Sequence, residues 1–538
     1  MKKSIILLFL FCCLPSYSQE DAWVYFNSKS NADFYFNNPL QMLSQRALNR
    51  RILQNIELDL KDVPITQSFI NQIANSNGIT VMARSKWLNA VHIRGSVANI
   101  NALTAFSFVN NVSFANKLLN TVASGKIIVQ SRNQKINKSL EVAAIYNYGT
   151  SSNQIQMLNG HLLHQQNFTG SGKIIAVLDS GFQGVNTVQP FDRLRTNNLI
   201  LGGYNFVSRN NNLYSADSHG TLVLSTMGGY TENQLIGTAP DASYYLYVTE
   251  DVLSENPVEE SLWVEAAETA DSLGVDIINS SLGYFAYDNP NYSYTYSDMN
   301  GTTSFISRGA NVAFSRGMIV VVSAGNSGLS SNPHIGSPAD AIKALTVGAV
   351  NATEQYVGFS SIGLSFDGRI KPDIMALGQN ATVSNMSGNI IGASGTSFSS
   401  PISCGLIACL WQAFPNKTNQ QIVDMIKASS DRFLNPNVQY GYGIPDFNLA
   451  LTNTLATFND FNAVYSLFPN PTSDILKITF SQTIKQAHFK LYNALGQIVL
   501  EKEMNNPTII SLEKLSNGVY FYNIQGDFSS QTGKIIKK

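Results

Sequence analysis

The chain has 538 residues, which is enough for about two to four domains that each bury a core. Hydrophobic residues make up 44% of it and charged residues 13%, a balance typical of globular proteins rather than disordered or fibrous ones. The 35 Lys and Arg residues nearly equal the 36 Asp and Glu residues, so the net charge is −1. Because there is no cationic excess to attract a phosphate backbone, nucleic-acid binding is not expected.

Residues 1–18 have the pattern of a secretory signal peptide. Two lysines precede an apolar run from Ile5 to Leu14, and Ser16-Tyr17-Ser18 supplies small residues for cleavage after the second serine. The run is too short to span a bilayer, and no later apolar stretch reaches about 18 residues, so the mature form is expected to have no transmembrane segment. A lipid anchor at Cys12 or Cys13 is the alternative, but neither cysteine follows a small residue.

Residues 19–115 are predicted to form one small α+β domain. Strand-like segments at 22–26, 80–82, 90–93 and 108–114 are separated by helix-like segments at 64–74 and 97–106. The order β-α-β-β-α-β is the split βαβ, or ferredoxin-like, arrangement. Residues 116–152 show no sustained periodicity and are rich in Ser, Asn, Lys and Gly, which predicts a linker and maturation region open to cleavage.

Residues 153–455 alternate between short apolar runs and helix-like stretches. The apolar runs lie at 174–178, 244–248, 275–278, 318–322 and 345–350. Strands buried on both faces have this composition, so we expect an α/β fold with a doubly wound, mainly parallel sheet and helices on each face. Ligands bind beyond the carboxyl ends of such strands, where we therefore look for chemistry. Residues 289–303, rich in Asn, Tyr and Ser, are expected to form a surface loop.

The two cysteines outside the signal peptide, Cys404 and Cys409, lie on one predicted helix. Helix geometry separates their Cα atoms by about 8–9 Å, which exceeds the reach of a disulfide. We expect both to be small buried side chains. After Phe461 the pattern changes again, and strand-like segments at 475–480, 488–492, 498–501 and 519–524 predict a small antiparallel β domain over residues 462–538.

Four polar residues lie where predicted strands end or helices begin. Asp179 follows the run at 174–178, His219 opens an apolar helical stretch, Asn326 lies in a Gly-rich loop, and Ser397 lies at the amino end of an apolar helix. Each position alone is ambiguous, because Asp-Ser-Gly and an Asn beside Gly are also ordinary turn sequences. The other five histidines are expected to be solvated or hydrogen-bonded locally.

Taken together, these four residues match the requirements of acyl transfer. A serine hydroxyl is a poor nucleophile until a neutral imidazole takes its proton, and the imidazole needs a carboxylate to fix its tautomer. The developing oxyanion needs donors that are already in place. Ser397, His219, Asp179 and Asn326 supply one residue for each role.

The motifs around these residues resemble those of the subtilases, the subtilisin-like serine proteases. They are Val177-Leu178-Asp179-Ser180-Gly181, His219-Gly220-Thr221 and Gly395-Thr396-Ser397-Phe398-Ser399-Ser400-Pro401, in the family's order Asp, His, Ser. Phe398 departs from the family, which more often has Met there.

The resemblance implies a role for each residue. It implies that Asp179 orients His219, that His219 acts as general base and then acid, that Ser397 is the nucleophile, and that Asn326 donates to the oxyanion together with the Ser397 backbone N–H. Ser280-Ser281-Leu282-Gly283 resembles the family's segment that pairs with an extended substrate backbone by strand addition.

The two flanking domains carry looser resemblances. Residues 20–115 are similar to subtilase propeptides, which implies a folding aid and temporary inhibitor. The last module contains Phe468-Pro469-Asn470-Pro471-Thr472 and Leu515-Ser516-Asn517-Gly518-Val519-Tyr520, and it resembles a C-terminal sorting domain of the type IX secretion system. That resemblance implies a Bacteroidetes-type bacterium, the type IX machinery as a partner, and a final place on the cell surface or in the medium. A substrate-binding or stabilising β domain is the alternative for this module.

We therefore expect a secreted serine endopeptidase that cleaves protein or peptide substrates through an acyl-enzyme. The alternative is an inactive subtilase fold that serves as a surface binding module. Segments 280–284 and 323–331, expected to wall the primary pocket, contain no Asp or Glu, so uncharged P1 side chains are expected. Family members often bind calcium, but the sequence has no ligand run such as Asp-x-Asp-x-Asp-Gly, so no metal or cofactor is assigned.

Overall fold

The structure is a computed structural model that describes residues 19–120, 146–215, 217–452, 465–468, 470, 472–480, 487–493, 495–504, 508–526 and 530–538. The chain divides into two compact units, one up to Leu451 and one from Thr452 onward, and each is described by itself. The predicted signal peptide and residues 121–145 of the predicted linker lie outside the described residues. Within the described part, no helix is both long and apolar enough to cross a membrane.

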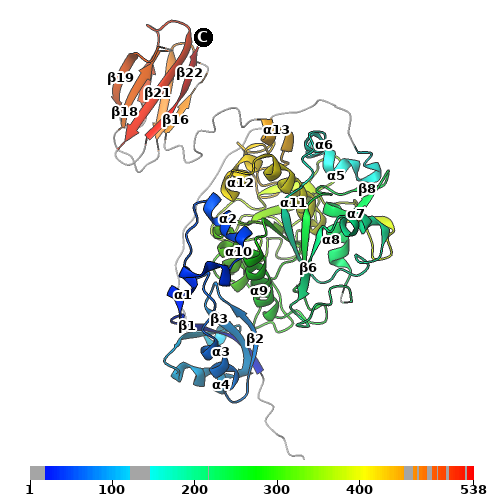
Figure 1. The fold of residues 1–538 in the computed structure, drawn as a ribbon. Helices are drawn as coiled ribbons and strands as arrows, with labels where there is room; N and C mark the ends of the chain where they lie inside the picture. The colour runs from blue at the N-terminus through cyan, green and yellow to red at the C-terminus, as the bar shows by residue number, and fades with distance from the viewer. Residues whose placement is uncertain are drawn as a thin grey trace, which may run out of the picture. The chain divides into compact units, whose positions relative to one another are not determined.

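The N-terminal domain is a four-stranded antiparallel sheet in the order β2-β3-β1-β4 (Figure 1). Its strands are β1 (Gln19–Phe26), β2 (Ile79–Ser85), β3 (Ala90–Ser96) and β4 (Val109–Phe114). Its helices are α3 (Gln67–Ala74) and α4 (Val97–Ala102), which η2 (Leu103–Ala105) extends. The predicted split βαβ arrangement is confirmed. Ile73 of α3 and Ile100 of α4 pack in its core.

Between β1 and α3 the structure adds elements that the sequence analysis did not predict. They are α1 (Ala32–Asn37), η1 (Pro39–Gln41) and α2 (Gln45–Leu53). Ser44 caps α2 by accepting a hydrogen bond from the Ala47 N–H at 3.2 Å. The buried residues of α2 are Ala47, Arg50 and Arg51, so its buried face is largely charged.

The central domain is built on a seven-stranded parallel sheet in the order β13-β12-β11-β10-β5-β9-β6. The strands are β5 (Ile174–Asp179), β6 (Ile200–Asn205), β9 (Ser243–Val248), β10 (Ile277–Ser280), β11 (Ile319–Ser323), β12 (Leu345–Val350) and β13 (Ile374–Leu377). Every residue of β5, β10, β11, β12 and β13 is buried. The predicted parallel sheet is confirmed, with β6 and β13 added to the five predicted runs.

Helices cover both faces of this sheet, as expected for a doubly wound fold. Ile175 and Val177 of β5 face one core with α8 and α11, whereas Ala176 and Leu178 face the other with α9 and α10. The helices are α5 (Ser152–Gln156), α6 (His161–His164), α7 (Asp192–Thr196), α8 (His219–Gly228), α9 (Val258–Leu273), α10 (Phe305–Ser315), α11 (Thr396–Ala413), α12 (Asn419–Ala428) and α13 (Phe447–Thr452). The shorter elements are η3 (Lys117–Leu119), η4 (Gly149–Ser151), η5 (Gln189–Phe191), η6 (Tyr296–Asp298), β7 (Tyr230–Thr231), β8 (Leu235–Ile236), β14 (Ala381–Ser384) and β15 (Ile390–Ala393). Tyr148 belongs to the first core, so packed structure reaches back beyond residue 153.

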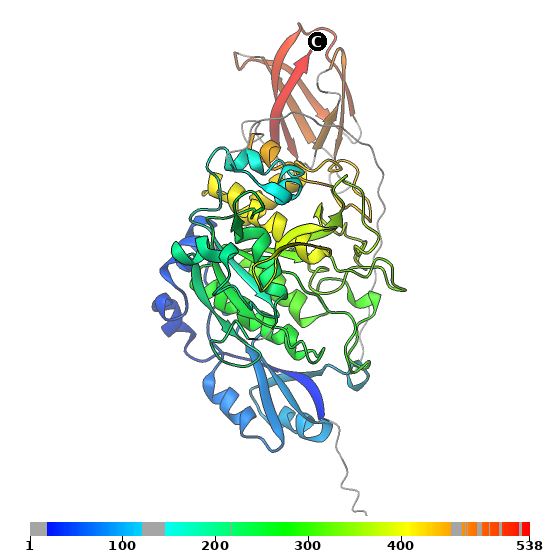
Figure 2. The same cartoon turned by 90° about the vertical axis from the view of Figure 1, so that its right-hand side faces the viewer.

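The N-terminal sheet packs its second face against α9 and α10 of the central domain, seen in blue and green in Figures 1 and 2. Trp23 and Trp87 of the N-terminal domain lie in the same hydrophobic cluster as Trp263 of α9 and Phe305 of α10. The rings of Trp23 and Phe305 stack with centroids 5.3 Å apart. The two domains therefore share a core.

Two expectations about the central domain have different outcomes. Cys404 and Cys409 are both buried and free, as predicted. Residues 289–303 form a loop with exposed positions such as Asn291 and Thr302, as predicted, but Tyr292 and Tyr294 within it are buried. The Tyr294 hydroxyl donates to the buried Glu260 carboxylate at 2.6 Å, so this loop is tied into the core by polar contacts rather than by an apolar pattern.

The C-terminal unit contains two antiparallel sheets, β16-β17-β20 and β19-β18-β21-β22, which confirm the predicted β domain. Its strands are β16 (Tyr465–Phe468), β17 (Ile475–Phe480), β18 (Ala487–Tyr492), β19 (Ile498–Met504), β20 (Thr508–Ser511), β21 (Gly518–Gly526) and β22 (Ser530–Lys537). Phe489, Leu491 and Ile524 lie in a hydrophobic cluster of its own. The sequence analysis missed β16, β20 and β22.

Candidate active site

Asp179 and His219 are brought together by the end of β5 and the start of α8. Asp179 is the last residue of β5, and His219 is the first residue of α8. The two elements approach closely because glycine stands at both contact points. A Cβ on Gly220 would lie 2.5 Å from the Gly181 carbonyl oxygen, and one on Gly181 would lie 2.4 Å from the Asp217 nitrogen.

The imidazole of His219 is held by the Asp179 carboxylate. His219 Nδ1 and Asp179 Oδ1 are 2.7 Å apart, and the side chain of His219 is 37% exposed whereas that of Asp179 is 2% exposed. The negative charge of Asp179 outweighs burial and raises the pKa of His219 to about 9. Asp217 and Glu250 add smaller contributions in the same direction. The geometry leaves Nε2 as the ring nitrogen available to a second partner.

Asp217 fixes the backbone at this point, a role the sequence analysis did not assign. Its Oδ1 accepts hydrogen bonds from the His219 N–H at 2.8 Å and from the Ser180 hydroxyl at 2.9 Å. It therefore joins the segment after β5 to the start of α8.

Ser397 lies in the first turn of α11, whose amino end carries unpaired N–H groups and the positive end of the helix dipole. Its hydroxyl donates to the Ser281 carbonyl at 3.3 Å, and the Ser281 hydroxyl donates to the Ser397 carbonyl at 2.9 Å. Ser281 therefore holds Ser397 through two hydrogen bonds, one to its carbonyl and one from its hydroxyl. No hydrogen bond joins Ser397 to His219 in this ligand-free arrangement of the described residues.

The side-chain amide of Asn326 is oriented by Thr396, the residue before Ser397. Asn326 Oδ1 accepts from the Thr396 N–H at 2.9 Å and from the Thr396 hydroxyl at 3.0 Å. The same hydroxyl accepts from the Gly325 N–H at 3.1 Å. Because the carbonyl end of the amide is occupied, its NH₂ end is the free donor.

A cavity of about 170 Å³ opens beside Ser397, and three of the four predicted substrate-binding residues line it. Ser281, Leu282 and Gly283 line it together with Asn326. Ser280 does not, because its buried hydroxyl accepts a hydrogen bond from the indole of Trp263 at 2.9 Å.

The cavity wall contains no acidic side chain, as the sequence predicted for this region. His334 lines it, although the sequence analysis had set this histidine aside; its ring stacks on Tyr296 with centroids 4.0 Å apart. Tyr284, another wall residue, donates its hydroxyl to both oxygens of Glu250 at 2.6 and 2.7 Å. Burial raises the pKa of the partly buried Glu250 to about 7.

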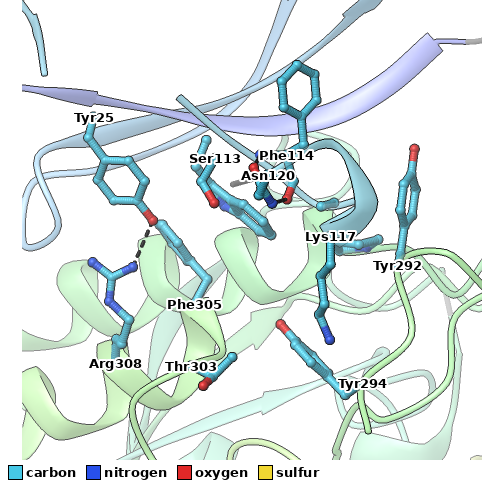
Figure 3. A pocket seen from close by; sticks show the side chains of 13 residues that line it. Tyr25, Ser113, Phe114, Lys117, Asn120, Tyr292, Tyr294, Thr303, Phe305 and Arg308 are labelled. Carbon is cyan, nitrogen blue, oxygen red and sulfur yellow. Dashed lines mark hydrogen bonds between the residues drawn. The ribbon is translucent and has the colours of Figure 1, made fainter. Parts of the chain in front are cut away.

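A second cavity, of about 190 Å³, lies between the N-terminal domain and the central domain. Figure 3 shows Tyr25, Phe305 and Tyr294 around it, with the Tyr25 hydroxyl 2.8 Å from the Arg308 guanidinium. Its lining contains neither a histidine nor a carboxylate. The chemistry of the described residues therefore favours the cavity beside Ser397 as the active site, although the interface cavity is slightly larger.

Metal binding has no assembled site in the part of the chain that the structure describes. Over those residues, no group of three or more His, Cys, Asp and Glu side chains is arranged to hold an ion.

Comparison with protein families identifies the central domain. The model of the subtilase family (peptidase S8) matches residues 170–443, just over half of the chain. The chain belongs to the subtilase family. The matched span contains Asp179, His219, Asn326 and Ser397.

Two further family models match the flanking domains of this subtilase. Residues 21–135 match the peptidase S8 propeptide domain of Bacteroidota, and residues 466–538 match the secretion system C-terminal sorting domain. With the catalytic domain between them, these matches make the chain a secreted subtilisin-like serine endopeptidase of a Bacteroidetes bacterium, made as a zymogen. We call the N-terminal domain the pro-domain and the central domain the catalytic domain from here on.

The subtilase is similar to several curated subtilisins. It is 31% identical over 294 residues to subtilisin NAT of Bacillus subtilis subsp. natto, covering 54% of this chain and 68% of that protein. It is also 31% identical over 294 residues to a subtilisin of Bacillus pumilus, covering 94% of that protein. Among solved structures, a crystal structure of MycP1 with its N-terminal propeptide removed aligns with a TM-score of 0.42 at 24% identity, covering 56% of this chain and 96% of that one.

Proposed function

We propose that Ser397 is the nucleophile of this protease, with His219 as its general base and then acid and Asp179 as the group that orients the imidazole. The observation that carries the proposal is the 2.7 Å contact between His219 Nδ1 and the buried Asp179 carboxylate. It leaves Nε2 free on a partly exposed ring whose centroid lies 6.2 Å from that of Phe398, the residue after Ser397. Substrate binding is expected to transfer the Ser397 hydroxyl from the Ser281 carbonyl to Nε2, since catalytic hydrogen bonds often form only in the substrate complex.

The acyl-enzyme forms when the Ser397 oxygen attacks the scissile carbonyl carbon and His219 takes the hydroxyl proton. His219 then gives that proton to the leaving amine, and a water repeats the sequence to release the acid. The negative charge that develops on the carbonyl oxygen is stabilised by the Asn326 NH₂ group and the Ser397 backbone N–H. The two Thr396 hydrogen bonds to Asn326 Oδ1 support this role, because they point the donor end of the amide away from Thr396.

Substrate recognition divides between the backbone and one side-chain pocket. We assign Ser281, Leu282 and Gly283 to pairing with an extended substrate backbone, and Ser280 to support of that segment from the Trp263 side. The cavity beside Ser397 receives the P1 side chain. Since its wall carries no acid to pair with Lys or Arg, uncharged P1 side chains are preferred.

The flanking domains control when and where the protease acts. The pro-domain buries one face of its sheet against α9 and α10, which supports roles as a folding aid and an inhibitor until it is cut off in the region 116–152. The C-terminal domain has its own core and is the part that the type IX secretion machinery would recognise.

Labelling with a serine-directed fluorophosphonate tests the assignment. The wild-type protease is expected to react once per chain, and Ser397→Ala to lose both the label and peptide hydrolysis. Ser327→Ala is the matched control, because Ser327 lines the same cavity and makes main-chain bonds that alanine keeps: its N–H donates to the Ser361 hydroxyl, and its carbonyl accepts from the Ser330 N–H. A label that survives Ser397→Ala would refute the proposed nucleophile.

A further inference from the structure

The pro-domain has a second contact with the catalytic domain, far from its sheet. Residues 32–62 leave the split βαβ fold between β1 and α3, and α2 within them packs beside α9 (Figures 1 and 2). This arm has a small apolar cluster of its own, which includes Met42, Leu43, Ala47 and Val63. Its first anchor is the Ser44 N–H, which donates to the Ser272 carbonyl at 2.8 Å.

The arm contacts a surface formed mainly by the carboxyl ends of two catalytic-domain helices, α9 and α10. We call this surface the arginine cradle; it consists of Gly172, Asp271, Gly274, Val275, Asp276, Arg316 and Gly317. Carbonyl groups at the end of a helix lack partners within the helix and carry the negative end of its dipole. The cradle is therefore built to accept hydrogen bonds from a cation.

Three arginines of α2 occupy these carbonyl groups. Arg46 donates to the Gly274 carbonyl at 2.9 Å and to the Gly172 carbonyl at 3.0 Å. Arg50 donates to the carbonyls of Val275 and Arg316, and Arg51 shares the Arg316 carbonyl. Gln54 completes the set by donating to the Gly317 carbonyl at 2.8 Å.

Asp271 and Asp276 of the cradle supply negative charge for the guanidinium groups, and Asp276 accepts from Arg46 at 2.5 Å. Within the arm itself, Asp62 also accepts from Arg51, at 2.7 Å. Asp271 accepts from Arg50 with one oxygen and from Arg51 with the other, at 2.9 Å for the second contact. The side chains of Arg50, Arg51 and Asp271 are 5%, 2% and 0% exposed, so these ions are desolvated. Burial alone would raise the pKa of Asp271, but the Arg51 and Arg50 guanidinium groups outweigh it and hold that pKa below its usual range.

The cradle is also complementary in shape to the arm. Both helices end in a glycine with positive φ, Gly274 at 84° and Gly317 at 92°. A Cβ on Gly274 would lie 2.7 Å from the Cγ of Arg46, and a Cβ on Gly317 would lie 2.9 Å from the Nε2 of Gln54. Side chains of the arm fill the space that these glycines leave open.

The cradle and the active site lie at opposite ends of the strands of the parallel sheet. Gly172, Asp276 and Gly317 precede β5, β10 and β11, whereas Asp179 and Ser281 stand at or beyond the carboxyl ends of β5 and β10. A six-residue strand such as β5 is about 20 Å long. A ligand in the cradle therefore leaves the substrate cleft open.

We propose that the arginine cradle is a docking site, separate from the active site, for helical segments that carry arginines at the spacing of Arg46, Arg50 and Arg51. The pro-domain arm is its ligand in the zymogen and holds the pro-domain on the protease after the chain is cut. The role of this site in the cell rests on the proposed maturation cleavage. Binding to the site does not, and the first experiment below measures binding without the protease's own activity.

The first experiment uses the full chain with Ser397→Ala and a recognition site for an unrelated protease inserted between residues 120 and 146. After cutting, dissociation of the pro-domain is followed on a surface that holds the catalytic domain by its C-terminal unit. Arg50→Gln with Arg51→Gln is expected to weaken retention by about 10²–10³-fold, because it leaves the buried Asp271 without a partner. Arg84→Gln is the matched control, since Arg84 of the same domain pairs with Glu265 of α9 at 3.5 Å but is exposed, and it should change retention by less than about 5-fold.

The second experiment removes any effect of the variants on folding. A synthetic peptide of residues 39–63 is added to the active, self-matured protease, and binding is measured by fluorescence anisotropy. The natural peptide should bind and leave hydrolysis of a short chromogenic substrate unchanged, whereas a peptide with citrulline at 46, 50 and 51 should not bind. Equal binding of both peptides, equal retention of the double variant and wild type, or competitive inhibition by the natural peptide would each overturn the proposal.

Discussion

The substitution Thr396→Val tests how the oxyanion donor is held. The buried Thr396 hydroxyl donates to Asn326 Oδ1 at 3.0 Å and accepts from the Gly325 N–H at 3.1 Å. Valine keeps the shape of the side chain and removes both bonds. The backbone bond from the Thr396 N–H to Asn326 Oδ1, at 2.9 Å, remains. The amide is therefore loosened rather than removed.

Of the two bonds lost, only the one to Asn326 Oδ1 holds the amide directly, so the expected loss is that of one bond. One neutral hydrogen bond contributes about 0.5–1.5 kcal/mol, so kcat should fall by about 2–12-fold, and KM should stay close to its wild-type value. Asn326→Ala removes the donor itself. For that change we expect a loss of about 10²–10³-fold in kcat, a range known from the same kind of substitution in subtilisin rather than worked from this structure.

A double-mutant cycle separates positioning from any direct effect of Thr396. If Thr396 acts through Asn326, Thr396→Val should cost nothing further once Asn326 is alanine. Steady-state rates with active-site titration measure the four corners, and Thr396→Ser, which keeps the hydroxyl, should retain most of the activity. Losses that multiply across the cycle would refute the reasoning.

Four other predictions follow from the same structure. Asp179 raises the pKa of His219 to about 9, and catalysis needs the neutral imidazole, so kcat/KM should rise with pH along a limb whose apparent pKa lies above 6.5. Glu250→Gln should lower that apparent pKa, because it removes a nearby negative charge. An apparent pKa below 6 in the pH-rate profile would contradict this. The same raised pKa stabilises the folded chain fully below pH 6.5, and this contribution is lost as pH rises through about 9. In a peptide library, uncharged P1 residues should be cleaved faster than Arg or Lys, and a strong basic preference would overturn the assignment of the cavity. Deleting residues 462–538, which contain the separate C-terminal unit, should leave purified activity nearly unchanged while the protease stays in the periplasm of its host; normal export of the truncated chain counts against the sorting role.

The parts of the site that could be predicted are the residues that belong to short, continuous sequence motifs. Asp179, His219 and Ser397 each stand at a strand end or a helix start within a short motif, so the pattern predicts their chemistry. The support of the site is different, because it depends on contacts between distant segments. Glu250 meets Tyr284 across 34 positions, and neither residue has a local signal of its role.

The arm was missed for a physical reason. A surface helix is recognised by an apolar stripe, but the buried face of α2 carries Arg50 and Arg51, which are stabilised by carbonyls and Asp271 rather than by apolar packing. The helix α9 differs, because Leu262, Ala266 and Ala270 form such an apolar stripe along it, and Gly274, at φ 84°, ends it.

The core shared by the pro-domain and the catalytic domain sets what separation of the two domains costs. Trp23 and Trp87 belong to a cluster that also contains residues of α9 and α10, while the pro-domain's own core lies on the opposite face of its sheet. Once released, the pro-domain must expose those indole rings to water, which lowers its free energy of unfolding. We therefore expect the separated pro-domain to unfold more readily than the docked one and, in that state, to be more open to proteolysis.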